Sequence, residues 1–149
     1  MERLKVKVKR LPSLGDLPLP SKQSSGSSGV DLYACVEGDV TLEPGRSMLV
    51  PTGISVEVPP GFEAQVRPRS GLALTKGVTV LNSPGTVDSD YRGEVKVILI
   101  NHGTVGATIR RGERIAQMVF CPVVDPVIEE VDCLDETPRG AGGFGHTGV

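Results

Sequence analysis

Hydrophobic and polar residues alternate with a period of two along much of the chain. Residues 4–9, Leu-Lys-Val-Lys-Val-Lys, alternate strictly and predict an edge strand with its lysines on the solvent face. Similar short runs predict further strands at residues 30–36, 47–50, 54–58, 63–67, 78–81, 94–100, 107–109, 114–122 and 127–131. Turn signals such as Pro44-Gly45 and Pro60-Gly61 separate these runs.

One segment, residues 70–76 (Ser-Gly-Leu-Ala-Leu-Thr-Lys), predicts a short helix, and Gly77 is a natural stop for it. Residues 11–29 are rich in Pro, Ser and Gly and predict a loop. Many short strands separated by turns indicate an all-β fold, either an antiparallel sandwich, a jelly roll or a barrel.

Composition supports this fold class. A chain of 149 residues is expected to form one domain with a core of its own. Because only 3% of the residues are aromatic and Trp is absent, that core must be built from Val, Ile and Leu. The 19 Gly and 12 Pro residues favour many turns over long helices.

Charge and cysteine content exclude several classes of protein. A net charge of −2 provides no general field for binding nucleic acid, so any anion must be held by locally placed arginines. Three cysteines without a Cys-x-x-Cys spacing predict neither a disulfide framework nor a zinc site. Residues 1–10 are charged and unlike a signal peptide, and no apolar run approaches membrane length. We therefore expect a cytoplasmic protein without a membrane or nucleic-acid partner.

Residues 82–94 carry the densest group of chemically active side chains. A Pro-Gly pair predicts a turn, after which two carboxylates, a tyrosine and an arginine follow before Gly93. Polar groups on a short, rigid hairpin are typical of catalytic sites, so this segment indicates an enzyme. A solvated acidic turn is the simpler alternative.

Asp88 and Asp90 also look like the start of a calcium loop. Such a loop needs oxygen ligands at its fifth and twelfth positions, which are Arg92 and Leu99 here. A calcium loop is therefore excluded.

The start of the predicted helix is a second candidate site. Ser70 is expected at the N-cap position, with Arg69 before it and Gly71 after it. Free backbone N–H groups, a hydroxyl and a guanidinium would together form a phosphate cradle. The alternative is an ordinary serine cap beside a surface arginine.

The C-terminal tail, residues 139–148, is a third candidate. Its glycine spacing formally matches the dinucleotide-binding fingerprint, but the chain ends before the helix that this fingerprint requires. Glycines let backbone N–H groups approach phosphates, Arg139 suits phosphate geometry, and Phe144 offers a face on which a base can stack. The alternative is a disordered polar terminus.

Five segments, residues 29–34, 68–72, 82–94, 111–118 and 139–148, resemble the five ordered motifs of the homotrimeric dUTPases. The resemblance extends from about residue 20 to the C-terminus. It implies a jelly-roll homotrimer with an exchanged C-terminal tail, in which each active site is shared between subunits. It also implies hydrolysis of dUTP to dUMP and pyrophosphate with Mg²⁺, which limits uracil incorporation into DNA and supplies dUMP for thymidylate synthesis.

The resemblance assigns roles to individual residues. Asp88 matches the catalytic aspartate that activates a water for attack on the α-phosphorus. Tyr91 matches the residue under the deoxyribose that excludes a 2′-hydroxyl. Asn82 matches the uracil-reading position, and Val87 lies on the same substrate-binding hairpin. Asp31 matches an aspartate that contacts the metal indirectly, through its water shell.

Further residues match the contacts to the triphosphate and to the base. The matching triphosphate positions in the body of the protein are Arg69, Ser70, Gly71 and Gln117. The matching positions in the tail are Arg139 and Thr147 at the γ-phosphate, Phe144 over uracil, and Gly145 as a further substrate-binding residue. We accordingly expect a nucleotidohydrolase domain at residues 1–138 and a flexible Gly-rich lid at residues 139–149.

Two alternatives remain. One is a dCTP deaminase of the same fold, a branch that carries Ser-Ser in its second motif and lacks the hairpin tyrosine. This chain has Ser70-Gly71 and Tyr91 instead. The other is a non-catalytic, nucleotide-binding trimer, in which Asp88 or the tail would be expected to be lost.

Overall fold

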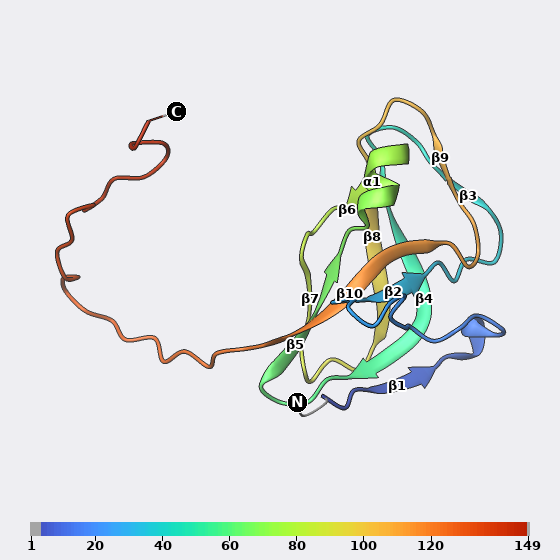
Figure 1. Cartoon of the computed structure of the whole chain (residues 1–149), viewed down its shortest axis with the longest axis horizontal. Coiled ribbons are helices and arrows are strands. Elements are labelled where there is room, and N and C mark those ends of the chain that lie inside the picture. The colour runs from blue at the N-terminus through green and yellow to red at the C-terminus, as the bar shows by residue number, and fades with distance from the viewer. Residues whose placement is uncertain (1–3, 149) are drawn as a thin grey trace.

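The computed structural model describes residues 4–148; residues 1–3 of the predicted domain and residue 149 of the predicted lid lie outside the described part. Two four-stranded antiparallel sheets form the body (Figure 1). The first contains, in spatial order, β1 (Lys7–Arg10), β4 (Ser47–Glu57), β8 (Glu94–Asn101) and β6 (Val78–Val80). The second contains β2 (Val30–Tyr33), β10 (Arg114–Pro122), β5 (Phe62–Arg67) and β7 (Gly85–Val87). The all-β, jelly-roll-like prediction is confirmed.

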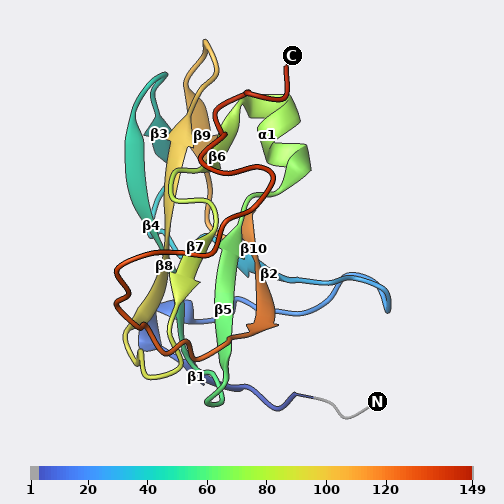
Figure 2. The same cartoon turned by 90° about the vertical axis from the view of Figure 1, so that its left-hand side faces the viewer.

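Three smaller elements complete the body: the pair β3 (Val40–Leu42) and β9 (Ala107–Ile109), the 3-10 turn η1 (Pro12–Leu14), and the helix α1 (Ser70–Lys76). Figure 2 shows α1 and the β3–β9 pair at the same end of the body. No helix in residues 4–148 has the length and hydropathy needed to span a bilayer.

Aliphatic side chains fill the space between the sheets, as the composition predicts. The largest fully buried side chains in residues 4–148 are aliphatic or methionine: Leu14, Leu32, Leu42, Ile54, Leu99, Ile109, Ile115, Met118, Val50, Val58, Val78 and Val95. Leu14 comes from η1, so the predicted loop at residues 11–29 contributes one side chain to the core.

The predicted edge strand is confirmed in kind, although it begins later than the alternation suggests, at Lys7. The Lys7 ammonium donates a hydrogen bond to the Glu57 carboxylate of β4 (2.7 Å), and this bond lowers the pKa of the Glu57 carboxyl. The strand predicted at residues 30–36 ends at Tyr33, because the chain then crosses between sheets: the Ala34 N–H bonds to the start of β10 and the Cys35 N–H to β4.

Two other strand predictions are wrong in their boundaries. Residues 47–50 and 54–58 form one long strand, β4, whose pairing with β8 shifts register between Pro51 and Ser55. Gly53 has a left-handed φ of 72° at this irregularity. The hydrophobic alternation of the sequence is interrupted there, and such an interruption also occurs at turns, so one strand was predicted as two. The three-residue strands β3 and β7 were not predicted.

The strand predicted at residues 127–131 is absent: this segment has no regular structure and its apolar side chains are exposed. Strand propensity needs a neighbouring strand to supply the hydrogen-bond ladder, and within this protomer none lies beside the segment. After β10 the chain instead leaves the body as an extended segment (Figure 1). We call residues 123–138 the arm and residues 139–148 the tail.

The boundaries of α1 agree with the prediction, but its cap does not. Arg69 occupies the N-cap position (φ −104°, ψ 126°) without a side-chain cap, and Ser70 is the first helical residue, so the predicted serine cap is wrong. Gly77 ends the helix in the left-handed conformation, as predicted, and its N–H bonds to the carbonyl of Ala73. The Ser70 side chain is therefore left free at the helix start.

Candidate active site

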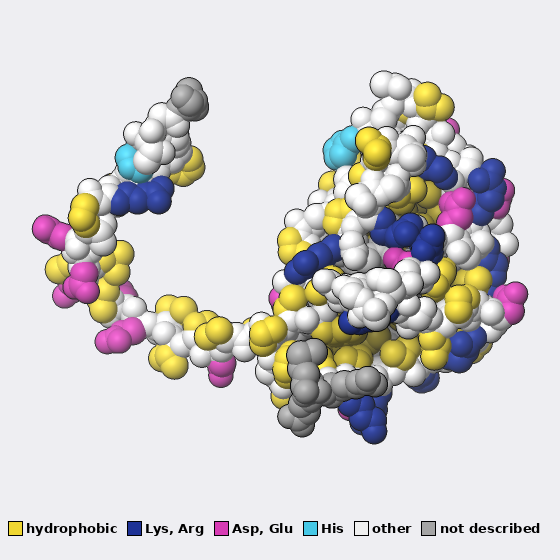
Figure 3. All heavy atoms as spheres, in the orientation of Figure 1, with side chains coloured by type: hydrophobic (Ala, Val, Ile, Leu, Met, Phe, Trp, Pro, Cys, Tyr) yellow, Lys and Arg dark blue, Asp and Glu magenta, His cyan; other side chains and the backbone are white. Residues whose placement is uncertain are grey.

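A hollow of about 400 Å³ lies beside the start of α1. Its lining brings together residues from α1, β2, β10 and the loop before β2, namely Gln23, Ser27, Ser28, Gly29, Asp31, Arg69, Ser70, Gly71, Arg114 and Gln117. Lys and Arg side chains gather on the face of the body below α1 (Figure 3). Five residues predicted from the sequence thus line one hollow. We call it the phosphate hollow.

Asp31 is the most buried charged group of the phosphate hollow, with 7% of its surface exposed. Its Oδ1 accepts a hydrogen bond from Arg69 Nε (3.1 Å), and its Oδ2 accepts one from Arg114 Nη1 (3.1 Å). Arg69 Nη1 also donates to the backbone carbonyl of Arg114 (3.3 Å). A nearly buried carboxylate that accepts one bond on each oxygen holds both guanidinium groups in fixed positions.

Gln117 is held by the segment that leads into α1. Its Nε2 donates to the carbonyl of Pro68 (3.0 Å), and its Oε1 lies against the Cα of Gly29, where a Cβ would come within 2.7 Å. Gly29 therefore provides the space in which the Gln117 side chain lies. The amide is fixed beside the backbone that carries Arg69 and Ser70.

The predicted catalytic hairpin forms the turn between β7 and β8. Asp88 is exposed, and its carbonyl accepts a hydrogen bond from the Tyr91 N–H (3.2 Å). The Tyr91 hydroxyl donates to the carbonyl of Glu94 (2.9 Å), and its ring lies over Gly93, where a Cβ would overlap the hydroxyl. Arg92 Nη1 donates to the carbonyl of Ser89 (2.7 Å). The turn is thus braced by its own groups and presents Asp88 to solvent.

Asn82 precedes β7, and Val87 is the last residue of this strand. Asn82 is exposed, and its Nδ2 would lie 3.1 Å from a Cβ at Gly85, so the glycine gives the amide room. Val87 is buried with 9% of its surface exposed and packs in the core cluster. Within this protomer, Val87 therefore anchors the hairpin to the hydrophobic core.

The hairpin and the phosphate hollow lie at opposite ends of the body. In the β5–β7 pair, Val87 pairs with Ala64 and Gly85 with Val66, so Asp88 follows β7 near the start of β5, whereas Arg69 follows the end of β5. Five residues of extended chain from Ala64 to Arg69 span roughly 16 Å. Figures 1 and 2 both show the β7–β8 turn at the end of the body opposite α1. One protomer does not bring Asp88 to its own phosphate hollow.

The tail contacts none of these groups within its own protomer and curves away from the body (Figure 1). Arg139 Nε donates to the carbonyl of Gly142 (2.8 Å). Phe144 is fully exposed and has a left-handed φ of 51°, and Gly145 follows with a φ of 87°. Thr147 is exposed as well. The four predicted tail residues therefore share one short, solvated segment.

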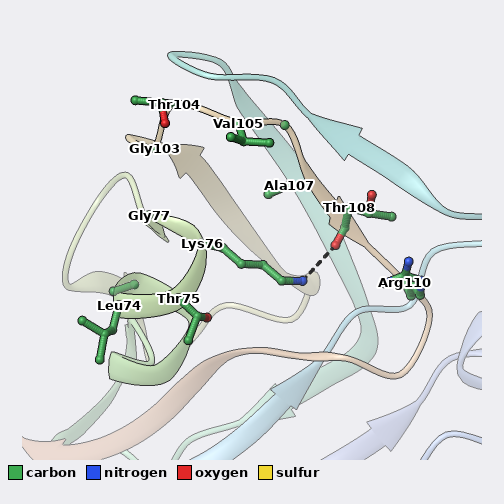
Figure 4. Close-up of a pocket in the computed structure, with 12 residues that line it drawn as sticks. Leu74, Thr75, Lys76, Gly77, Gly103, Thr104, Val105, Ala107, Thr108 and Arg110 are labelled. Atoms are coloured by element: carbon green, nitrogen blue, oxygen red, sulfur yellow. Dashed lines mark hydrogen bonds between the residues drawn. The ribbon is translucent and has the colours of Figure 1, made fainter.

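A larger hollow, of about 610 Å³, lies at the other end of α1 (Figure 4). None of the predicted site residues lines it. Lys76 points into it and donates a hydrogen bond to the carbonyl of Thr108 (3.2 Å), and Leu74 and Val105 expose apolar surface at its rim. The predicted residues Asp31, Arg69, Ser70, Gly71 and Gln117 line the smaller, phosphate hollow instead.

Residues 4–148 contain no group of three or more His, Cys, Asp or Glu side chains that could hold a metal ion. Each oxygen of Asp31 accepts one guanidinium bond and keeps a second lone pair, which can accept a hydrogen bond from a metal-bound water. The donor set fits a cation that is bound mainly by substrate phosphates and water.

Sequence reasoning did not single out the other five residues that line the phosphate hollow, namely Gln23, Ser27, Ser28, Gly29 and Arg114. Gln23 lies in a low-complexity loop that carries no pattern. Arg114 lies within the motif at residues 111–118, where the alternation in β10 gave no indication of which face its side chain occupies.

Comparison with known proteins agrees with the predicted fold and family. The dUTPase family model matches residues 16–148. The chain is 60% identical, over 97% of each sequence, to deoxyuridine 5'-triphosphate nucleotidohydrolase of Caldanaerobacter subterraneus subsp. tengcongensis. It is 58% identical to the enzyme of the same name from Methylocella silvestris, over 99% of this chain and 94% of that protein.

Solved structures are similar at much lower identity. A variant dUTPase of Staphylococcus bacteriophage 80alpha, solved with dUpNHpp, has a TM-score of 0.87 at 22% identity over 97% of this chain and 99% of that one. A variant dUTPase of phage phi11 of S. aureus, described with a structural Mg(II) ion, has a TM-score of 0.79 at 18% identity over 89% of this chain and 99% of that one.

Proposed function

The chain belongs to the dUTPase family, and we propose that it hydrolyses dUTP to dUMP and pyrophosphate with Asp88 as the general base. The observation that carries this proposal is the phosphate hollow, in which two arginines, a free helix start and a fixed glutamine surround one space. Such a site suits a polyanion that is bound end-on to a helix.

Asp88 orients a water molecule and accepts its proton as the water oxygen attacks the α-phosphorus. The bond from that phosphorus to the bridging oxygen breaks, and pyrophosphate leaves. The braced turn supports this role, because positioning supplies much of the rate when a carboxylate is held rigidly.

The triphosphate is bound by the Arg69 guanidinium, the Ser70 hydroxyl, the Gly71 N–H and the Gln117 amide. Mg²⁺, when bound, neutralises phosphate charge and favours departure of pyrophosphate. Asp31 would accept a hydrogen bond from the water shell of this ion, and the lone pairs that its arginine bonds leave free are compatible with that role.

Base and sugar are recognised by the hairpin. Asn82 reads uracil together with nearby backbone groups. Val87 forms the apolar floor on which the uracil-binding hairpin rests. Tyr91 packs under the deoxyribose and leaves no room for a 2′-hydroxyl. Its hydroxyl bond to Glu94 and its contact with Gly93 support this role, because they hold the ring in one orientation.

The active unit is a homotrimer in which each site is shared between subunits. Two observations support this proposal. The first is the separation of Asp88 from the phosphate hollow within one protomer. The second is the arm, which exposes Val124, Val127, Ile128 and Leu134 at more than four-fifths of their surface each. An apolar run of this size needs a partner surface.

The chain is divided into a domain, residues 1–138, and a lid, residues 139–149. The lid of one copy closes over the substrate that is bound to another copy. Arg139 and Thr147 bind the γ-phosphate, Phe144 covers uracil, and Gly145 lets the backbone approach closely. The glycine-rich backbone and full exposure of Phe144 support a lid that orders on binding.

The enzyme acts in the cytoplasm. All three cysteines are free thiols, of which Cys35 is buried, and free thiols are usual in a reducing compartment.

An assay of pyrophosphate release from dUTP with Mg²⁺ tests the function, and Asp88→Asn tests the base. We expect the variant to lose at least ~10²-fold in turnover while nucleotide affinity stays within a few-fold. Near-normal turnover in the variant would assign the base elsewhere, with Asp90 as the next candidate. A deaminase would instead release ammonia from dCTP, and a binding module would release neither product.

A further inference from the structure

The net charge of the phosphate hollow depends on Arg114. Asp31 neutralises one guanidinium, so Arg69 and Asp31 alone would form a neutral pair. The other residues that line the hollow are uncharged. Its positive charge therefore comes from Arg114, and a neutral site would be a poor one for a triphosphate.

A β-bulge brings Arg114 to this face. The pairing of β10 with β2 shifts register between Arg114 and Ala116, and both Ile115 and Ala116 are buried, at 1% and 0% exposed. In regular alternation, Arg114 and Gln117 would point to opposite faces of the sheet. Because the bulge inserts one residue, both side chains lie on the outer face beside Asp31.

The Arg114 guanidinium keeps donors for a ligand. Among residues 4–148, its side chain makes one hydrogen bond, from Nη1 to Asp31. Its side chain is 42% exposed, and it lines both the phosphate hollow and an adjoining hollow of about 500 Å³ on the α1 side. A guanidinium has several N–H donors in a planar fork that matches phosphate oxygens.

We infer that Arg114 is a second phosphate-binding arginine of the active site and that Asp31 is the positioning residue that aims it and Arg69 at the triphosphate. This inference rests on the proposed dUTP hydrolysis, and it adds a binding residue from the start of β10. Asp31 thereby has a structural task in addition to its contact with the metal's water.

The test measures binding of dUpNHpp with Mg²⁺ by calorimetry, for the wild type, Arg114→Gln, Asp31→Asn and the double variant. A charge-assisted hydrogen bond is strong enough that Arg114→Gln should weaken binding by ~10-fold or more. Inhibition by deoxyuridine, which has no phosphate, should stay within ~2-fold, because base and sugar are bound elsewhere.

The double variant separates two explanations of that loss. If Arg114 only neutralised Asp31, removing both charges would restore the affinity for dUpNHpp, and the inference would be overturned. If Arg114 binds phosphate directly, the double variant stays weak. Should Arg114→Gln not fold, Arg114→Lys keeps the charge without the fork and should still bind dUpNHpp several-fold more weakly than the wild type; unchanged binding would overturn the inference.

Arg110→Gln is the matched control, because Arg110 is an exposed arginine nearby that pairs with Asp39 and Glu113 and lines neither of these two hollows. It should bind dUpNHpp as the wild type does. If its affinity for dUpNHpp fell as much as that of Arg114→Gln, the loss would follow from removing any positive charge, and the inference would be overturned. A wild type that neither binds the analogue nor hydrolyses dUTP would contradict the proposed function itself. A functional wild type with unchanged affinity in Arg114→Gln would contradict only this inference.

Discussion

Gln117 occupies the space that a side chain at residue 29 would need: a Cβ on Gly29 would lie 2.7 Å from Gln117 Oε1 and 3.2 Å from a methyl of Val119. The glycine at the start of β2 and the glutamine of β10 are therefore matched in size across two neighbouring strands. Gln117 is a proposed triphosphate contact. The absence of a side chain at Gly29, in the motif at residues 29–34, therefore supports substrate binding by the motif at residues 111–118.

Gly29→Ala should displace Gln117 and weaken dUpNHpp binding by ~3- to 10-fold, about the net contribution of one ordinary hydrogen bond. Gly26→Ala is the control, because a Cβ there meets nothing within 4 Å. Adding Gln117→Ala to Gly29→Ala should cost little more, since the contact is already lost. Equal affinities in Gly29→Ala and the wild type would show that Gln117 does not contribute.

Tyr91→Ala should narrow the preference for dUTP over UTP, measured as the ratio of their kcat/KM values, because removing a steric wall admits the 2′-hydroxyl. Gly93→Ala should act in the same direction, since a Cβ there would overlap the Tyr91 ring and push it aside. Gly38→Ala, at a position with open space, should leave the ratio unchanged. If Tyr91→Ala also left it unchanged, another residue would discriminate the sugar.

Mixing two inactive variants tests whether sites are shared. Asp88→Asn removes the base and Arg69→Gln removes a phosphate contact, and the two residues lie at opposite ends of one protomer. Co-refolded hybrids should regain dUTP hydrolysis, because some sites then combine an intact hairpin with an intact phosphate hollow from another chain.

Light scattering should give the mass of a trimer at micromolar concentration. Hybrids without activity, or a fully active monomer, would mean that each chain forms a complete site by itself.

The absence of Trp makes the tail accessible to fluorescence. Phe144→Trp introduces a single indole at the proposed lid, and its emission should change saturably when dUpNHpp and Mg²⁺ are added, because stacking on a base alters its surroundings. Arg139→Ala in this background should weaken the response by removing the charged anchor.

Truncation after Pro138 is the complementary experiment. It should abolish most turnover and leave the assembly intact, because the tail makes no contact with the core of its own protomer. An indole that does not respond, or a truncated protein with full activity, would leave the tail as a disordered terminus.

The period-two pattern was sufficient to predict the strands that have one buried face, such as β5 and β8. It failed where pairing, and not local alternation, decides the structure. Residues 127–131 have strand propensity but no partner strand in the protomer. The bulge after Arg114 moves this side chain to the same face of the sheet as Gln117, and no residue type in the sequence marks that shift. For the same reason the motifs identified Arg69, Ser70 and Gln117 as neighbours, while Arg114 emerged only from the register of two strands.

The position of the arm at the C-terminus has a consequence for synthesis. Every strand of the body has been made once Pro122 has emerged from the ribosome, and domains fold as units during synthesis from the N-terminal side. The body can therefore begin to pair its strands before the apolar arm leaves the ribosome. In the proposed shared-site trimer, association then follows folding, and a chain becomes an enzyme only when its last residues reach another folded copy.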